Sequence, residues 1–174
     1  MPRRLLDVPT TVTGARLTVD DGDDGVRTLA LNGHCQSDIK VLKGGVLDEA
    51  QPLELVQVMS VLSLAWINER QVTAPRVLLL GLGGGSIARV LSATLPTDGS
   101  IHSVELEPEV IQAAVDFFGL QLREGRCTAE AGDCAAFLRN LHSQCQNGGG
   151  DDANYDVIIL GTIAWAGLSG PRRP

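Results

Sequence analysis

The pattern of apolar and polar positions changes near Pro75. Before it, residues 12–19 and 26–31 alternate apolar and polar side chains and are separated by a loop of Asp and Gly. This pattern predicts a β-hairpin, because Asp and Gly tolerate the positive φ angles of tight turns. A mostly apolar segment follows and predicts a helix over about 52–70. Its polar residues recur every third position, so we expect a buried helix with one narrow polar stripe, formed by Glu54, Gln57, Ser60 and Ser63.

After Pro75, apolar runs of about five residues alternate with helical segments. Continuous Val, Ile and Leu runs between helices predict a parallel sheet covered on both faces. We therefore predict an α/β fold with two parts, a small β-rich N-terminal unit over 1–74 and a parallel-sheet domain over 75–174. The expected strands lie at 77–80, 101–105, 126–130 and 155–160, and the expected helices at 86–94, 108–118 and 133–144.

The strand at 77–80 runs directly into a glycine-rich loop that contains Gly81, Gly83, Gly84 and Gly85. Glycines allow a tight turn and a close approach of the backbone to a ligand, although a strand-to-helix turn without a ligand explains the same run. The next strand ends at Glu105, 20 residues beyond Gly85. A carboxylate at this place accepts hydrogen bonds from two neighbouring ribose hydroxyls in nucleotide-binding α/β folds.

Further acids follow the second and third strands. Glu107 and Glu109 are expected to supply favourable charge to the first turn of the helix opened by Pro108. Asp133 follows the third strand, where it is placed either to cap a helix or to bind an adenine amino group. Because the carboxyl ends of parallel strands lie at one edge, the glycine loop, Glu105 and Asp133 should meet there.

Several runs together resemble a known family. VLLLGLGGGS, HSVELEPEVIQAA, AGDCAAFL and YDVIIL, with LALNGHCQSD upstream, are similar to the spermidine-synthase-like transferases that depend on S-adenosylmethionine. The resemblance covers about residues 14–160. It implies a Rossmann-like methyltransferase sheet and, as cofactor, S-adenosylmethionine or its decarboxylated form.

The resemblance also implies roles for individual residues. The glycines of 81–85 would form the loop beneath the amino-acid part of the cofactor, and Glu105 would hold the ribose. Asp133 with Cys134 would contact the adenine, and Gln36 would reach the cofactor from the N-terminal unit. No residue is assigned as a catalytic base, and no metal site is expected.

The sequence departs from the aminopropyltransferase pattern at three places. The acid in the glycine loop is replaced by Gly84, the acid after the fourth strand by Gly161, and an expected Tyr-His pair is absent. The loop GLGGGS is closer to the methyltransferase half of the enzymes that methylate translation elongation factor 1-alpha. We therefore favour methyl transfer to an amine, on a small molecule or a protein. Aminopropyl transfer in polyamine synthesis, an NAD-dependent enzyme and a non-catalytic cofactor-binding or interaction module stay open.

Composition and charge limit the partners and the cellular location that the sequence predicts. The 174 residues carry a net charge of −7 and 3% aromatic residues, which disfavours a nucleic-acid partner. No apolar stretch is long enough for a membrane helix, and the N-terminus lacks the apolar core of a secretory signal. The four cysteines form no CxxC pair and have no His at metal spacing. We expect reduced thiols and a cytoplasmic location.

The sequence is short after the fourth expected strand. Only 14 residues follow position 160, whereas sheets of the related methyltransferases continue with about three further strands. We therefore expect a sheet that is incomplete at the C-terminus. The exposed edge at 155–160 would then pair with a second copy or with a partner chain.

Overall fold

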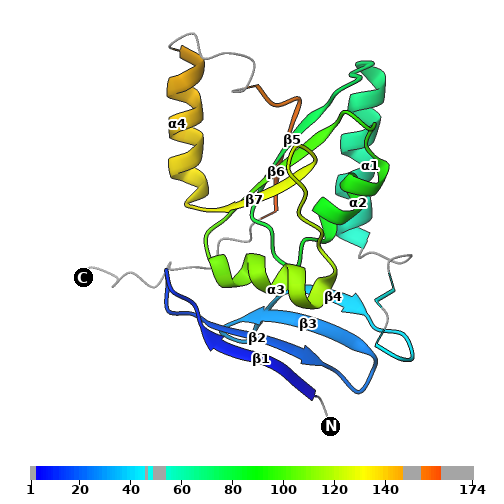
Figure 1. The fold of residues 1–174 in the computed structure, drawn as a ribbon, viewed down its shortest axis with the longest axis vertical. Coiled ribbons are helices and arrows are strands. Elements are labelled where there is room, and N and C mark those ends of the chain that lie inside the picture. The colour runs from blue at the N-terminus through cyan, green and yellow to red at the C-terminus, as the bar shows by residue number, and fades with distance from the viewer. Residues whose placement is uncertain (1–2, 46, 49–53, 147–153, 162–174) are drawn as a thin grey trace, which may run out of the picture.

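The computed structural model describes residues 3–45, 47–48, 54–146 and 154–161. They form two four-stranded sheets and four helices (Figure 1). The predicted α/β fold with a β-rich N-terminal part is confirmed.

The N-terminal sheet is antiparallel. Its strands β1 (Arg3–Pro9), β2 (Arg16–Asp21), β3 (Val26–Leu31) and β4 (His34–Lys40) lie in sequence order. The predicted hairpin corresponds to β2 and β3, and β1 and β4 extend it on either side. Alternating residues of the hairpin are fully buried, which explains why its sequence alternates.

The second sheet is parallel, with strand order β7-β6-β5-β8. It consists of β5 (Arg76–Leu80), β6 (Ser100–Glu105), β7 (Cys127–Ala131) and β8 (Val157–Leu160). The central strand β5 is buried on both faces from Val77 onward, as its continuous apolar run predicts.

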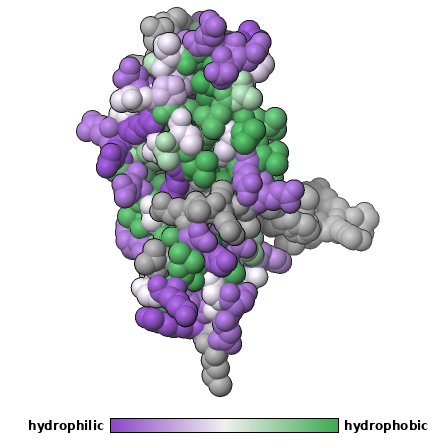
Figure 2. Space-filling model, turned by 90° about the vertical axis from the view of Figure 1, so that its right-hand side faces the viewer, coloured by the Kyte–Doolittle hydropathy of each residue, from purple (hydrophilic) through white to green (hydrophobic). Residues whose placement is uncertain are grey.

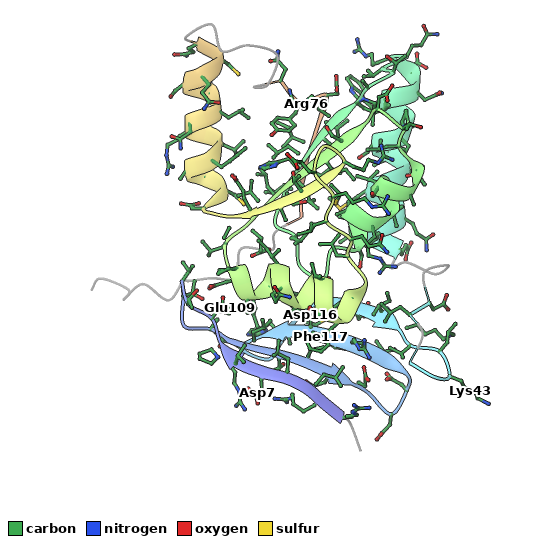
Figure 3. The ribbon with its side chains drawn as sticks, viewed as in Figure 1. Asp7, Lys43, Arg76, Glu109, Asp116 and Phe117 are labelled. Atoms are coloured by element: carbon green, nitrogen blue, oxygen red, sulfur yellow. The ribbon has the colours of Figure 1, made fainter. Side chains whose placement is uncertain are left out.

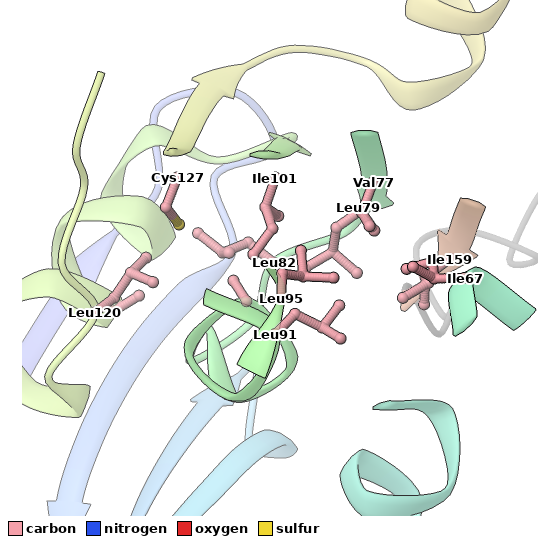
Figure 4. Close-up of a cluster of buried hydrophobic side chains, with 12 residues drawn as sticks. Ile67, Val77, Leu79, Leu82, Leu91, Leu95, Ile101, Leu120, Cys127 and Ile159 are labelled. Atoms are coloured by element: carbon pink, nitrogen blue, oxygen red, sulfur yellow. The ribbon is translucent and has the colours of Figure 1, made fainter. Parts of the chain in front are cut away.

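The helices cover both faces of the parallel sheet. α1 (Glu54–Glu69) and α2 (Ser86–Thr94) lie on one face, where they enclose the cluster of buried side chains in Figure 4. α4 (Cys134–Gln146) lies on the opposite face. α3 (Pro108–Phe118) lies between the two sheets and packs against the N-terminal sheet through Val110, Ala113 and Phe118 (Figure 1).

The predicted polar stripe of α1 is correct for Glu54 and Gln57, which are exposed, and wrong for its two serines. Ser60 and Ser63, which were expected in an exposed polar stripe, are buried together with Val56 and Ile67. The serines are small enough to bring α1 close to α2 and the sheet, and the Ser63 hydroxyl donates to the Met59 carbonyl at 2.8 Å. Large apolar side chains are exposed instead, at Leu55, Val58, Val61, Leu62 and Trp66. Figure 2, which looks onto the side of the molecule where α1 lies, shows hydrophobic side chains gathered in its upper half.

α1 also bears on how the chain divides. It precedes residue 75, yet it packs against α2 and β8 of the parallel sheet, and Ile67 belongs to the same buried cluster as Leu79 and Ile159. The division into 1–74 and 75–174 stays a prediction.

Within the described part of the chain, no helix is long and apolar enough to cross a membrane. The four cysteines are free. Strand β8 is paired with β5 among the described residues, and its Ile158 and Leu160 side chains are 53% and 64% exposed.

Candidate functional site

The glycine loop connects β5 to α2, as the sequence predicts. Gly81, Gly83 and Gly85 have φ angles of 86°, 54° and 75°, in the left-handed region that favours glycine. Gly85 is the N-cap of α2. The loop therefore depends on glycine for its backbone conformation.

Glu105, at the end of β6, lies directly against this loop. Its Oε2 accepts hydrogen bonds from the amides of Leu82 at 2.8 Å and Gly83 at 3.3 Å, and its Oε1 accepts one from the Glu107 amide at 3.3 Å. A carboxylate has about four acceptor positions, so it retains capacity for a further donor. The structure thus joins the two features that the sequence singles out, and it gives Glu105 a second task in holding the loop.

Every amide of the loop is satisfied by the protein itself. The amides of Leu82 and Gly83 donate to Glu105, and that of Gly84 donates to the Ser37 hydroxyl at 2.8 Å. The Gly81 amide donates to the Val104 carbonyl, and the Gly85 amide donates to the Leu82 carbonyl. A phosphate-binding loop presents amides to its ligand, whereas the amides of residues 81–85 point to partners within the protein.

Ser37, on β4, explains why two of the glycines lack side chains. A Cβ on Gly84 would lie 2.8 Å from the Ser37 Cβ and 3.0 Å from the Phe118 ring, and a Cβ on Gly83 would lie 3.1 Å from the Ser37 Oγ. Close packing within the protein, rather than the approach of a ligand, therefore occupies the space beside these two glycines. Sequence reasoning did not identify Ser37.

Gln36 precedes Ser37 on β4. Its carbonyl oxygen lies 3.5 Å from the position that a Gly83 Cβ would take, so its backbone is next to the loop. Its side-chain amide donates to the His34 carbonyl at 3.1 Å. The strand reaches the site from the N-terminal sheet, as expected, but the amide group is folded back on its own strand.

Asp133 and Cys134 come from the loop between β7 and α4. The Asp133 Oδ1 accepts a hydrogen bond from the Ala135 amide at 2.8 Å, which caps α4. The Cys134 Sγ lies 3.5 Å from the Val104 carbonyl. Burial raises the pKa of the Cys134 thiol, the Gly81 amide lowers it, and the charges of Glu105 and Asp133 raise it further. The thiol is thus favoured over the thiolate, and these groups lie within electrostatic range of one another.

Glu107 is a buried carboxylate whose role the sequence did not reveal. It was expected to supply charge to the first turn of α3, but its side chain makes no capping hydrogen bond there. It accepts hydrogen bonds from the amides of Val12 at 3.1 Å and Thr13 at 2.9 Å and from the Thr13 hydroxyl. It therefore holds the β1–β2 turn against the start of α3.

The neighbouring groups support this attachment. Burial raises the pKa of Glu107, but hydrogen bonds from Thr13, Val12 and Thr10 outweigh it, so the net pKa is lowered. Glu109, labelled in Figure 3 at the start of α3, accepts a hydrogen bond from the Thr11 amide at 3.2 Å. The contacts join residues about 95 positions apart in the sequence, which no local pattern predicts.

No group of three or more metal-ligating side chains lies close enough together to hold an ion among the described residues.

The comparison with family models finds no match. A curated protein of Drosophila pseudoobscura pseudoobscura, named "eEF1A lysine and N-terminal methyltransferase homolog", is 29% identical over 93 residues. The match covers 53% of this chain and 12% of that protein.

Solved structures match over most of the chain. A spermidine synthase in complex with the transition-state analogue AdoDATO has a TM-score of 0.67 at 16% identity, over 93% of this chain and 47% of that one. A probable spermidine synthase from Corynebacterium glutamicum has a TM-score of 0.61 at 20% identity, over 87% and 50%. The chain has the spermidine-synthase fold.

These structural matches confirm the resemblance found in the sequence. At sequence identities of 16% to 20% they show the fold alone. A third structure with this fold, from Thermotoga maritima, has a TM-score of 0.62 at 16% identity and covers 91% of this chain. This chain spans about half the length of these structures, between 46% and 50%.

Proposed function

We propose that the chain binds S-adenosylmethionine and belongs to a methyltransferase that acts on an amine. The observation that carries the proposal is Glu105, which stands at the end of β6 and accepts hydrogen bonds from the glycine loop after β5. Two adjacent strands thus bring a carboxylate and a tight glycine turn to one edge of the sheet, where α/β folds of this kind bind nucleosides.

The residues present fit this cofactor better than a dinucleotide. The pyrophosphate of NAD binds to amides of the glycine loop and of the first turn of the following helix, and the amides of residues 81–85 are already used within the protein. S-adenosylmethionine carries no phosphate. Its ribose hydroxyls and ammonium group need hydrogen-bond acceptors, and its carboxylate needs donors. Glu105 would hold the ribose, Asp133 and Cys134 the adenine, and the loop carbonyls the amino-acid part.

The absence of two acids favours methyl transfer over aminopropyl transfer. Gly84 and Gly161 stand where the aminopropyltransferase pattern has carboxylates. A side chain at either position would require its neighbours to shift, because a Cβ would lie 2.8 Å from the Ser37 Cβ at Gly84 and 3.0 Å from the Gly81 carbonyl oxygen at Gly161.

The proposed acceptor is an amine of a protein. The curated relative is named for methylation of a lysine and an N-terminus, and both groups are amines. The bound cofactor would supply a methyl group on a sulfonium, and the chain would position it for in-line attack by the neutral amine. Four free cysteines among the described residues support a reducing, cytoplasmic setting.

Aminopropyl transfer in polyamine synthesis is the second candidate. The observation in its favour is that the spermidine-synthase match includes the N-terminal sheet and extends over 93% of the chain. Decarboxylated S-adenosylmethionine would then be the cofactor. A cofactor-binding module without turnover is the third candidate.

Calorimetry with S-adenosylmethionine, its decarboxylated form, methylthioadenosine and NAD tests the proposal. We expect S-adenosylmethionine to bind and NAD not to bind. Glu105→Gln should weaken binding by about 10- to 100-fold, because a hydrogen bond to a charged group contributes about 1.5 to 3 kcal/mol.

Glu130→Gln, an exposed acid on the neighbouring strand β7, is the matched control and should leave affinity unchanged. Since Glu105 also holds the glycine loop, thermal melting must show that both variants are folded. Equal affinity of wild type and a folded Glu105→Gln variant would reject the proposed ribose contact. Tighter binding of the decarboxylated form would favour aminopropyl transfer.

A further inference from the structure

Ser37 is a polar side chain of the N-terminal sheet that lies against the glycine loop. It is partly buried on β4, and its Oγ accepts a hydrogen bond from the Gly84 amide at 2.8 Å. The other side chains nearest to residues 83–85 are those of Phe118 and Leu120, which are apolar. The N-terminal sheet therefore brings one hydroxyl group to the loop.

The Ser37 hydroxyl has a hydrogen to donate. A hydroxyl offers one hydrogen and two acceptor positions. The Gly84 amide uses one acceptor position, and the hydrogen has no acceptor among the residues that the structure describes. Accepting a bond from an amide also polarises the O–H group and so strengthens it as a donor. The partner that such a hydroxyl favours is an anionic group beside the loop.

The proposed cofactor carries an anionic group at this end. Under the proposed function, on which this inference rests, residues 81–85 lie beneath the amino-acid part of S-adenosylmethionine. That part has an ammonium group, which needs acceptors, and a carboxylate, which needs donors. The amides of residues 81–85 all donate within the protein. The carboxylate therefore needs a donor from outside this loop.

The absence of a side chain at Gly84 admits the serine. A Cβ on Gly84 would lie 2.8 Å from the Ser37 Cβ and 3.0 Å from its Oγ. The aminopropyltransferase pattern has a carboxylate at position 84, and a carboxylate beside the loop would repel that of S-adenosylmethionine. This chain has a neutral donor there instead, which favours a cofactor that keeps its carboxylate.

We propose that the Ser37 hydroxyl donates to the carboxylate of S-adenosylmethionine and so makes the chain select this cofactor over its decarboxylated form. The decarboxylated form keeps the sulfonium and ammonium groups but offers the hydroxyl no anionic partner. The N-terminal sheet thereby contributes to the choice of cofactor, in addition to its packing against α3.

Calorimetry of wild type and Ser37→Ala with S-adenosylmethionine, its decarboxylated form and methylthioadenosine tests the contact. The affinity for S-adenosylmethionine relative to the decarboxylated form should fall by about 10- to 100-fold, because the variant loses a hydrogen bond to a charged group with one of them only. Methylthioadenosine has no amino-acid part, so its affinity reports damage to the loop. Ser92→Ala, partly buried on α2 beyond the loop, is the matched control and should leave the ratio unchanged.

Ser37→Asp is a second variant, which keeps an acceptor for the Gly84 amide. It replaces the donor by a negative charge, so S-adenosylmethionine should bind more weakly by about 100-fold or more. The decarboxylated form, whose ammonium group is attracted by that charge, should not lose affinity. Thermal melting shows which variants are folded, and either folded variant is sufficient for the comparison.

The possible results distinguish failure of this inference from failure of the proposed function. Suppose that wild type binds S-adenosylmethionine and that a folded Ser37→Ala variant keeps the wild-type ratio, even with all three ligands weakened equally. The hydroxyl would then only support the loop, with the carboxylate held by other donors such as the first-turn amides of α2, and the inference would be wrong. A wild-type chain that prefers the decarboxylated form would also overturn it. A wild-type chain that binds none of the three ligands would overturn the proposed function itself.

Discussion

Helices α1 and α3 differ in what covers the side that faces away from the parallel sheet. Both place one side against the parallel sheet and its neighbouring helices. The other side of α3 is buried against the N-terminal sheet, with Val110 and Phe118 packed among residues of β2 and β3. The other side of α1 has no such cover among the described residues, and its leucines, valines and tryptophan are exposed.

The difference shows that a largely apolar helix does not specify its own neighbours. The N-terminal sheet covers α3 because buried hydrogen bonds also attach it there, through Glu107 and the β1–β2 turn. Variants on the two helices should therefore differ in their effect on the free energy of unfolding.

The largest difference is expected between two aromatic truncations. Phe118→Ala removes a fully buried ring from α3 and should lower the free energy of unfolding by about 3 to 5 kcal/mol. Trp66→Ala removes a half-exposed ring from α1 and should cost about 1 kcal/mol or less when the chain is dilute. Urea denaturation at low protein concentration measures both. Losses of equal size would show that the side of α1 that carries Trp66 is buried in a way that the described residues do not account for.

A smaller loss is expected when the polar attachment of α3 is weakened. Glu107→Gln keeps the size of the side chain but turns an amide NH₂ toward backbone donors, so it should cost about 2 to 3 kcal/mol. Glu109→Gln is the control, because Glu109 accepts from the single Thr11 amide and should cost about 1 kcal/mol or less. A Glu107→Gln variant as stable as wild type would contradict the proposed attachment.

The Glu107→Gln difference should also depend on pH. The pKa of Glu107 is lowered in the folded state from an ordinary value of 4.5. Its contribution is therefore present above that value and is lost as the pH falls through the folded pKa. The stability gap between wild type and variant should be full at neutral pH and should narrow in acid below 4.5. Denaturation series at several pH values would measure it, and a gap that widens in acid would reject the assignment.

The smallest change in the free energy of unfolding is expected for substitutions on the inward side of α1. The Ser60 hydroxyl is buried and has no hydrogen-bond partner among the described residues. Ser60→Ala should therefore be neutral or stabilising by up to about 1 kcal/mol. Ser63→Ala, which removes a hydroxyl bonded to Met59, is the comparison and should gain less. Thermal melting of the pair would test this, and a clear loss for Ser60→Ala would point to a hidden partner for its hydroxyl.

The sequence predicted the parallel sheet because its strands are continuous apolar runs, and it found Glu105 from its distance to the glycine loop. It failed at α1, where small polar residues were taken to face solvent. Serines can pack tightly when they bond within their own helix, as Ser63 does. Ser37 was not singled out, and Glu107 was assigned only to the start of its own helix, because the partners of both residues are tens of positions away in the sequence. Their roles come from how the two sheets meet, which no local pattern encodes.

The exposure of α4 has a consequence for hydrogen exchange. None of its thirteen residues is fully buried, and it rests on the sheet through partly buried Phe137 and Leu141. We expect its amides to exchange with solvent through local opening, whereas those of α3 exchange through global unfolding. Asp133 and Cys134 stand at the first turn of α4. A nucleoside held by these two residues would bind the closed form of the helix and so slow exchange throughout its length.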